Sequence, residues 1–168
     1  MTLPSPVTGG CQCGAVRFAA PALGRASICH CRMCQKAFGG YFGPLVAAPG
    51  LVWTRGAPAE FRSSNKVRRG FCAACGTPLT YQADDATVVD VALGALDRPE
   101  DVPPTVQLAV ESRLSFFAAL AGLPEERTGA DPRDAPFQDG LVSYQHPDHD
   151  TATWPDIRPP ADETRDPT

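Results

Sequence analysis

The sequence lacks any long apolar run. Its longest purely apolar stretch covers residues 116–121, whereas a membrane-spanning helix needs about 18 or more such residues. Its opening residues, MTLPSPVTGG, have neither the basic part nor the apolar part of a secretory signal. These two absences predict a cytoplasmic protein that has no membrane partner.

Long helices are also unlikely, because residues that interrupt them are abundant. Proline and glycine account for 18 and 15 of the 168 residues, a composition that favours short strands joined by turns. We expect strands over residues 15–19, 26–29, 41–47, 51–54, 60–63, 67–71, 78–82, 87–92 and 105–110. Short helical turns are expected over 32–38 and 98–102, and residues 115–120 fit either a helix or a last strand. The predicted class is therefore mainly β, with mostly antiparallel sheets.

The number of cysteines is odd. There are seven, all within the first 75 residues, and an odd number of thiols in a cytoplasmic protein argues against a disulfide framework. They are grouped as C-x-C, C-x-C-x-x-C and C-x-x-C rather than scattered. Such grouping indicates metal ligation, and all-thiolate ligation points to zinc. The three groups are Cys11 and Cys13; Cys29, Cys31 and Cys34; and Cys72 and Cys75.

Seven thiols divide most economically into four and three, which predicts two zinc ions per chain. The two outer pairs, Cys11/Cys13 and Cys72/Cys75, would form a closed structural site of four thiolates. The middle three, Cys29, Cys31 and Cys34, would hold the second zinc and leave one position open for a substrate. The alternative is that His30 completes a second structural site, although on a strand it would face away from its neighbouring cysteines.

Charge is divided unevenly along the chain. Residues 1–75 contain nine basic residues and one acid, whereas the rest contains six basic residues and 18 acids. The net charge of the whole chain is −4. Part of the basic excess would neutralise metal thiolates, and the remainder would attract an anionic substrate or nucleic acid. Arg68 and Arg69 are candidates for either role, as carboxylate-binding residues or as charge balance beside the thiolates.

Three cysteine-containing segments together resemble the glutathione-dependent formaldehyde-activating enzyme family, which includes the centromere protein V domain. The segments are GGCQCGAVRF, CHCRMCQKAFGG and RRGFCAACGTPLTY, and the resemblance covers about residues 8–115. It implies a zinc-stapled β fold of the Mss4-like type, with Cys11, Cys13, Cys72 and Cys75 on a structural zinc and Cys29, Cys31 and Cys34 on a zinc at the active site. We expect three parts: a flexible leader over 1–8, a zinc-binding domain over 9–123 and a mobile or loosely packed tail over 124–168.

The tail is rich in proline and acids and has few aliphatic residues. Such a composition buries too little apolar surface to offset the entropy of ordering the chain. Tyr144 and Trp154 are the residues that would hold it to the domain, and we expect His146 and His149 to be solvated.

The resemblance implies a carbon–sulfur lyase that joins glutathione to formaldehyde, giving S-hydroxymethylglutathione. The expected partner is a small thiol such as glutathione, and nucleic acid is not expected. Zinc at the middle cysteines would ionise the thiol, and His30, Arg32 or Lys36 would protonate the product oxygen. Two alternatives stay open: a non-catalytic zinc-stabilised module that binds nucleic acid or protein, and a thiol or redox sensor.

Overall fold

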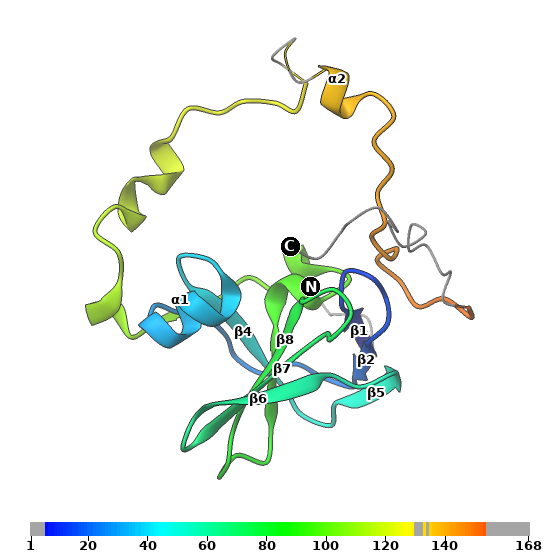
Figure 1. Ribbon diagram of the computed structural model, residues 1–168. Helices are drawn as coiled ribbons and strands as arrows, with labels where there is room; N and C mark the ends of the chain where they lie inside the picture. The colour runs from blue at the N-terminus through cyan, green and yellow to red at the C-terminus, as the bar shows by residue number, and fades with distance from the viewer. Residues whose placement is uncertain (1–5, 130–132, 134, 154–168) are drawn as a thin grey trace, which may run out of the picture.

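The computed structural model describes residues 6–129, 133 and 135–153 (Figure 1). The chain is mainly β, as predicted, and forms two sheets with few short helices. The smaller sheet has the order β1-β2-β5, and the larger has the order β10-β3-β4-β9-β8-β7-β6. Among the described residues, no helix has the length and apolarity needed to cross a membrane.

The strand bounds follow the expected runs closely. They are Val7–Gly10 (β1), Arg17–Ala20 (β2), Ala26–Cys29 (β3), Gly43–Ala48 (β4), Val52–Arg55 (β5), Ala59–Ser64 (β6), Val67–Phe71 (β7), Pro78–Ala83 (β8), Val89–Ala92 (β9) and Val106–Leu108 (β10). Strand β1 lies partly inside the stretch expected as a leader, of which residues 1–5 lie outside the described residues. All neighbouring strands pair antiparallel except β10 and β3, which pair parallel.

The helices are short. The predicted turn over residues 32–38 is α1 (Arg32–Phe38), which ends at Gly39 in the left-handed conformation. The remaining helical segments are η1 (Leu93–Ala95), η2 (Pro99–Asp101), η3 (Val110–Ser112), η4 (Phe117–Gly122) and α2 (Ala135–Gln138). The sequence left residues 115–120 open between a helix and a last strand, and most of this stretch lies in the helical segment η4.

The apolar core lies on one face of the larger sheet and against the smaller one. Val46 and Val91, register partners on β4 and β9, are fully buried and belong to the same cluster as Phe18 of β2. Because side chains alternate along a strand, the residues beside them in sequence face the opposite side of the sheet. That opposite face, rather than the core face, carries the site described below.

Beyond β10 the chain leaves the sheets in a wide arc and returns beside the β1–β2 connection (Figure 1). Residues 145–151, here called the docked segment, lie against that connection, where the backbone N–H of His146 donates to the carbonyl of Gln12 over 2.7 Å. Trp154, one of the two residues expected to hold the tail, lies outside the described residues.

Candidate metal centres

The outer cysteine pairs converge although about sixty residues separate them in sequence. Cys11 and Cys13 lie between β1 and β2, and Cys72 and Cys75 lie between β7 and β8. Their four Sγ atoms lie within 4.8 Å of one another. The Cys11–Cys13 and Cys13–Cys72 sulfur pairs are 3.6 and 3.8 Å apart, which matches the edge of about 3.8 Å expected for sulfurs at ~2.3 Å from a tetrahedral zinc.

The turns that carry these cysteines are shaped for thiolate ligands. Gly14 and Gly76 follow the second cysteine of each pair and have φ of 76° and 78°, which a residue without Cβ adopts without strain. The backbone N–H of Val16 donates to Sγ of Cys11 over 3.2 Å. Such donors stabilise the charged form of sulfur, the form that binds metal.

The acidities of these thiols agree with a metal site. Burial raises the pKa of Cys11 to about 12, so without a neighbouring cation this sulfur would stay protonated. At Cys75 burial acts in the same direction, but hydrogen bonds from Thr77 outweigh it and lower the pKa to about 6. A set of four sulfurs, two buried and two half-buried, with mixed acidities fits a divalent cation, which deprotonates its thiol ligands.

The middle cysteines form a separate group of three, whose Sγ atoms also lie within 4.8 Å of one another. Cys29 ends β3, Cys31 is the N-cap of α1, and Cys34 lies in the first turn of that helix. The backbone N–H of Cys34 reaches Sγ of Cys31 over 3.4 Å. An extended strand followed at once by a helix start therefore turns all three sulfurs toward one point.

His30 does not join this group. It is fully buried, its Nε2 pairs with Oε1 of Gln107 at 2.9 Å, and its ring packs edge-on against Phe117 at 4.7 Å. Among the described residues, the three cysteines thus come together with no histidine or acid as a fourth candidate ligand. The alternative of a second closed site receives no support from this geometry.

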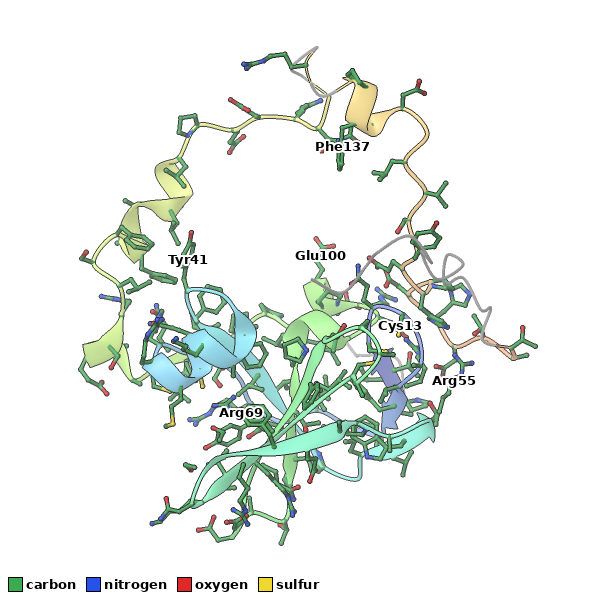
Figure 2. All side chains as sticks on the ribbon, in the orientation of Figure 1. Cys13, Tyr41, Arg55, Arg69, Glu100 and Phe137 are labelled. Atoms are coloured by element: carbon green, nitrogen blue, oxygen red, sulfur yellow. The ribbon has the colours of Figure 1, made fainter. Side chains whose placement is uncertain are left out.

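Arg69 provides the positive charge beside the three sulfurs (Figure 2). Its side chain is 4% exposed, and its Nη2 donates to Sγ of Cys34 over 3.3 Å. Burial raises the pKa of Cys34 to about 12, and the Arg69 guanidinium opposes that shift. Arg68 instead pairs with Gln82, so of the two arginines only Arg69 lies at the site.

Strand register explains how the site is assembled. On the face opposite the core, Arg69 pairs with Tyr81, Tyr81 with Asp90, and Cys29 with Leu108, so side chains from β7, β8, β9, β3 and β10 share one surface. A cavity of about 170 Å³ lies on this surface, beneath α1. It is lined by Ser27, Cys29, Cys31, Met33, Cys34, Leu45, Ser63, Val67, Arg69, Tyr81, Asp90 and Leu108.

Residues 6–112 match the model of the glutathione-dependent formaldehyde-activating enzyme family. The chain belongs to this family. It is also similar to a protein from Rhodobacter sphaeroides of known crystal structure, with 22% identity and a TM-score of 0.48. That match covers 60% of this chain and 98% of the other.

Within this family member, sequence reasoning found the sulfurs but missed part of the cavity. Tyr81 and Asp90 lie on the cavity surface, whereas the proton donors proposed from the sequence, His30, Arg32 and Lys36, do not line it. The available signal was an acid in the middle of the apolar strand segment Val89–Ala92, because acids are depleted in strands.

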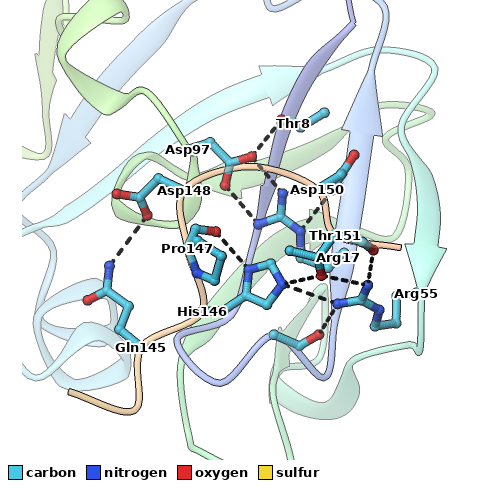
Figure 3. Close-up of polar contacts among 11 residues, drawn as sticks. Thr8, Arg17, Arg55, Asp97, Gln145, His146, Pro147, Asp148, Asp150 and Thr151 are labelled. Atoms are coloured by element: carbon cyan, nitrogen blue, oxygen red, sulfur yellow. Dashed lines mark hydrogen bonds and ion pairs between the residues drawn. The ribbon is translucent and has the colours of Figure 1, made fainter. Parts of the chain in front are cut away.

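Figure 3 shows a polar network that includes the docked segment. Arg17, Asp97 and His146 of this network line one pocket with Cys11 of the four-cysteine group. The buried guanidinium of Arg17 binds Asp97 at 2.6 Å and Asp150 at 2.7 Å, and Asp97 also accepts from Thr8. Burial by itself raises the pKa of Asp97, but these hydrogen bonds reverse the shift and lower it. Asp150 thereby joins the docked segment to β2.

His146 was expected to be solvated, and that prediction is wrong. The side chain is 3% exposed because it packs against Gly14, where a Cβ would lie 2.2 Å from the imidazole ring. Nδ1 lies 2.7 Å from the carbonyl of Pro147, and Nε2 lies 3.3 Å from Nη1 of Arg55. Since an arginine can only donate and a carbonyl can only accept, these partners fit a neutral ring with its proton on Nδ1.

Proposed function

We propose that this protein adds a small, glutathione-like thiol to a small, formaldehyde-like aldehyde and forms an S-hydroxyalkyl adduct, the reverse of a carbon–sulfur lyase step. Membership of the family supports this reaction class. The observation that carries the proposal is the group of three cysteines at a cavity, with no fourth candidate ligand among the described residues. A ligand set of three protein groups is typical of catalytic zinc, and one of four is typical of structural zinc.

The proposed ligands are those predicted from the sequence. Cys29, Cys31 and Cys34 would hold the catalytic zinc, and Cys11, Cys13, Cys72 and Cys75 would hold the structural one. When bound in the open site, zinc keeps a substrate thiol as the nucleophilic thiolate near neutral pH. A cytoplasmic location suits these seven free thiols, because that compartment keeps cysteine reduced.

The chain's own residues would prepare the site for that thiolate. Arg69 balances the negative charge of the sulfur group, since its guanidinium is buried and bonded to Cys34. The side chains of Leu45, Met33 and Leu108 line the cavity and limit the water around the reacting atoms. The volume of about 170 Å³ admits the reacting end of a thiol together with a small aldehyde.

The rest of a larger thiol would extend outward along α1. A second cavity, lined by Met33, Lys36, Ala37, Phe61, Arg62 and Ser63, shares Met33 and Ser63 with the first. Lys36 provides positive charge there, the sign that complements carboxylate groups such as those of glutathione, whereas the charge of Arg62 is paired with Asp84.

Cobalt substitution tests the proposal. Protein loaded with two Co²⁺ ions should change its visible spectrum on titration with glutathione, and the change should correspond to one of the two ions. S-methylglutathione, which has no thiol, should leave the spectrum unchanged. Exchange NMR of formaldehyde and glutathione, which separates enzymatic from spontaneous addition, should show turnover with zinc-loaded protein. An unchanged cobalt spectrum together with no turnover would contradict the proposal.

A further inference from the structure

Asp90 occupies an unusual place in the larger sheet. It lies on β9, which is flanked on both sides, by β4 and β8, and its register partners are Ala47 and Tyr81. The half-buried side chain faces the three-cysteine cavity. A carboxylate is disfavoured in such a position, both by strand preference and by the cost of removing its charge from water.

No basic residue offsets that cost. Within the described part of the chain, the Asp90 carboxyl has no hydrogen bond or ion pair, and burial raises its pKa. Other aspartates behave differently: Asp84 pairs with Arg62 and Asp97 with Arg17, and in both cases the pKa is lowered. Arg69, the cation on the same face, contacts Cys34, Ser63 and the Tyr81 ring. Its buried Nη1 has no hydrogen-bond partner among the described residues, so it does not bind the Asp90 carboxyl.

An unpaired acid in a reactive cavity is the arrangement found where a protein needs a proton-transfer group. We propose that Asp90 transfers the proton in the thiol–aldehyde addition, taking it from the incoming thiol and returning it to the oxygen of the adduct. This inference rests on the proposed function, and it names a residue that the cysteine pattern does not reveal.

The step balances without any oxidant or reductant. The carboxylate of Asp90 accepts the proton of the thiol, and the sulfur lone pair forms the new C–S bond. The π electrons of the carbonyl move to its oxygen, which then takes the proton from the Asp90 carboxyl and regenerates the carboxylate. The net change is the addition of S–H across C=O.

Other ionisable groups line the same cavity as Asp90. Each could either transfer the proton in place of Asp90 or alter the charge around it. Tyr81 on β8 is the direct rival, because its hydroxyl is a donor on the same surface and burial raises its pKa. Arg69 on β7 holds its charge permanently. The cysteines from β3 and α1 become ligands of the proposed zinc rather than proton carriers.

The first test compares turnover in four zinc-loaded variants by exchange NMR. Asp90→Asn keeps the shape of the side chain and removes the proton-accepting oxygen, so kcat should fall by about 10²- to 10⁴-fold, the usual contribution of general acid–base catalysis. Asp85→Asn makes the same change at an exposed turn residue and should leave kcat within about twofold. Asp90→Glu should recover part of the loss, and Tyr81→Phe should cost less than Asp90→Asn.

The second test counts protons and does not depend on turnover. Calorimetric titration with glutathione in two buffers of different ionisation enthalpy gives the number of protons released when the thiol binds. In the wild-type protein Asp90 retains the thiol proton, so Asp90→Asn should release about one more proton per bound thiol. Zinc content should be the same in both proteins, which separates this role from a structural one.

The outcomes distinguish this inference from the proposed function. Wild-type turnover with equal kcat in Asp90→Asn, or equal proton release in the two proteins, would overturn the role of Asp90 alone. A larger loss in Tyr81→Phe than in Asp90→Asn would assign the proton to Tyr81 and overturn it likewise. A wild-type protein that neither binds glutathione nor turns over would overturn both.

Discussion

Nη2 of Arg69 donates a hydrogen bond to Sγ of Cys34 over 3.3 Å, and both side chains are buried. The contact joins β7 to α1 and places a permanent cation beside the three-cysteine group. Because a buried ion is costly without its partner, the arginine and a thiolate at Cys34 stabilise one another.

Arg69→Met should therefore weaken zinc binding at the three-cysteine site only. Loss of a buried partner costs on the order of 3 kcal/mol, or roughly 100-fold in affinity. Dialysis against a competing chelator should leave the variant with about one zinc per chain under conditions in which the wild type keeps two. Arg68→Met, at the neighbouring residue that pairs with Gln82, is the matched control, and equal zinc retention in both variants would refute the role of Arg69.

The two carboxylates that bind Arg17 should contribute unequally to stability. Asp97 is 8% exposed at its side chain, whereas Asp150 is 48% exposed. Asp97→Asn should lower the free energy of unfolding by about 3 kcal/mol because it leaves Arg17 poorly compensated in the interior. Asp150→Asn should cost less than about 1 kcal/mol, since solvent screens that pair. Denaturant unfolding of the zinc-loaded variants measures both, and equal losses would be inconsistent with the network as described.

Docking of residues 145–151 should depend on pH through His146. Burial lowers the pKa of this imidazole, so the docked state favours the neutral ring, which lies between Arg55 and the Pro147 carbonyl. The contribution of the neutral His146 ring to docking is fully present above pH 6.5, about the pKa of the undocked imidazole. It is lost as the pH falls through the lower pKa of the docked imidazole. The nearby charges of Arg17 and Asp97 oppose and favour protonation, respectively.

Hydrogen exchange measures this docking directly. The amide of His146, which donates to Gln12, should lose protection, corrected for intrinsic exchange rates, as pH falls below about 6.5. His146→Gln removes the titrating ring and should make the corrected protection independent of pH. Wild-type protection that does not change over this range would contradict the assignment of His146 as the titrating group.

The cysteine spacing was enough to predict which sulfurs would meet. A C-x-x-C turn fixes its two sulfurs locally, and Cys29, Cys31 and Cys34 lie within six residues. The meeting of the two outer pairs, about sixty residues apart, followed instead from dividing seven ligands into four and three. Most strands were also predicted, because alternating or apolar runs were bounded by Gly, Pro and Asp.

The rest of the cavity depends on pairing that the sequence does not encode locally. Arg69, Tyr81 and Asp90 share a surface only because of the register of β7, β8 and β9. Strand β1 was not predicted because two of its four residues, VTGG, are glycines, which are depleted in strands. Gly9 is needed there because a Cβ would lie 2.3 Å from the carbonyl oxygen of Ala95. The docked segment was missed because ion pairs and hydrogen bonds hold it, rather than the aliphatic residues that signal packing.

The division of the seven cysteines into four and three is the central claim, and zinc stoichiometry in two serine variants tests it most directly. Cys31→Ser should retain the fold and about one zinc per chain while losing thiol-dependent aldehyde consumption. Cys72→Ser should lose the fold in addition to the activity, because structural zinc sites contribute on the order of 10 kcal/mol to folding. Undiminished turnover in Cys31→Ser, or a folded Cys72→Ser protein with two zinc ions, would contradict the account.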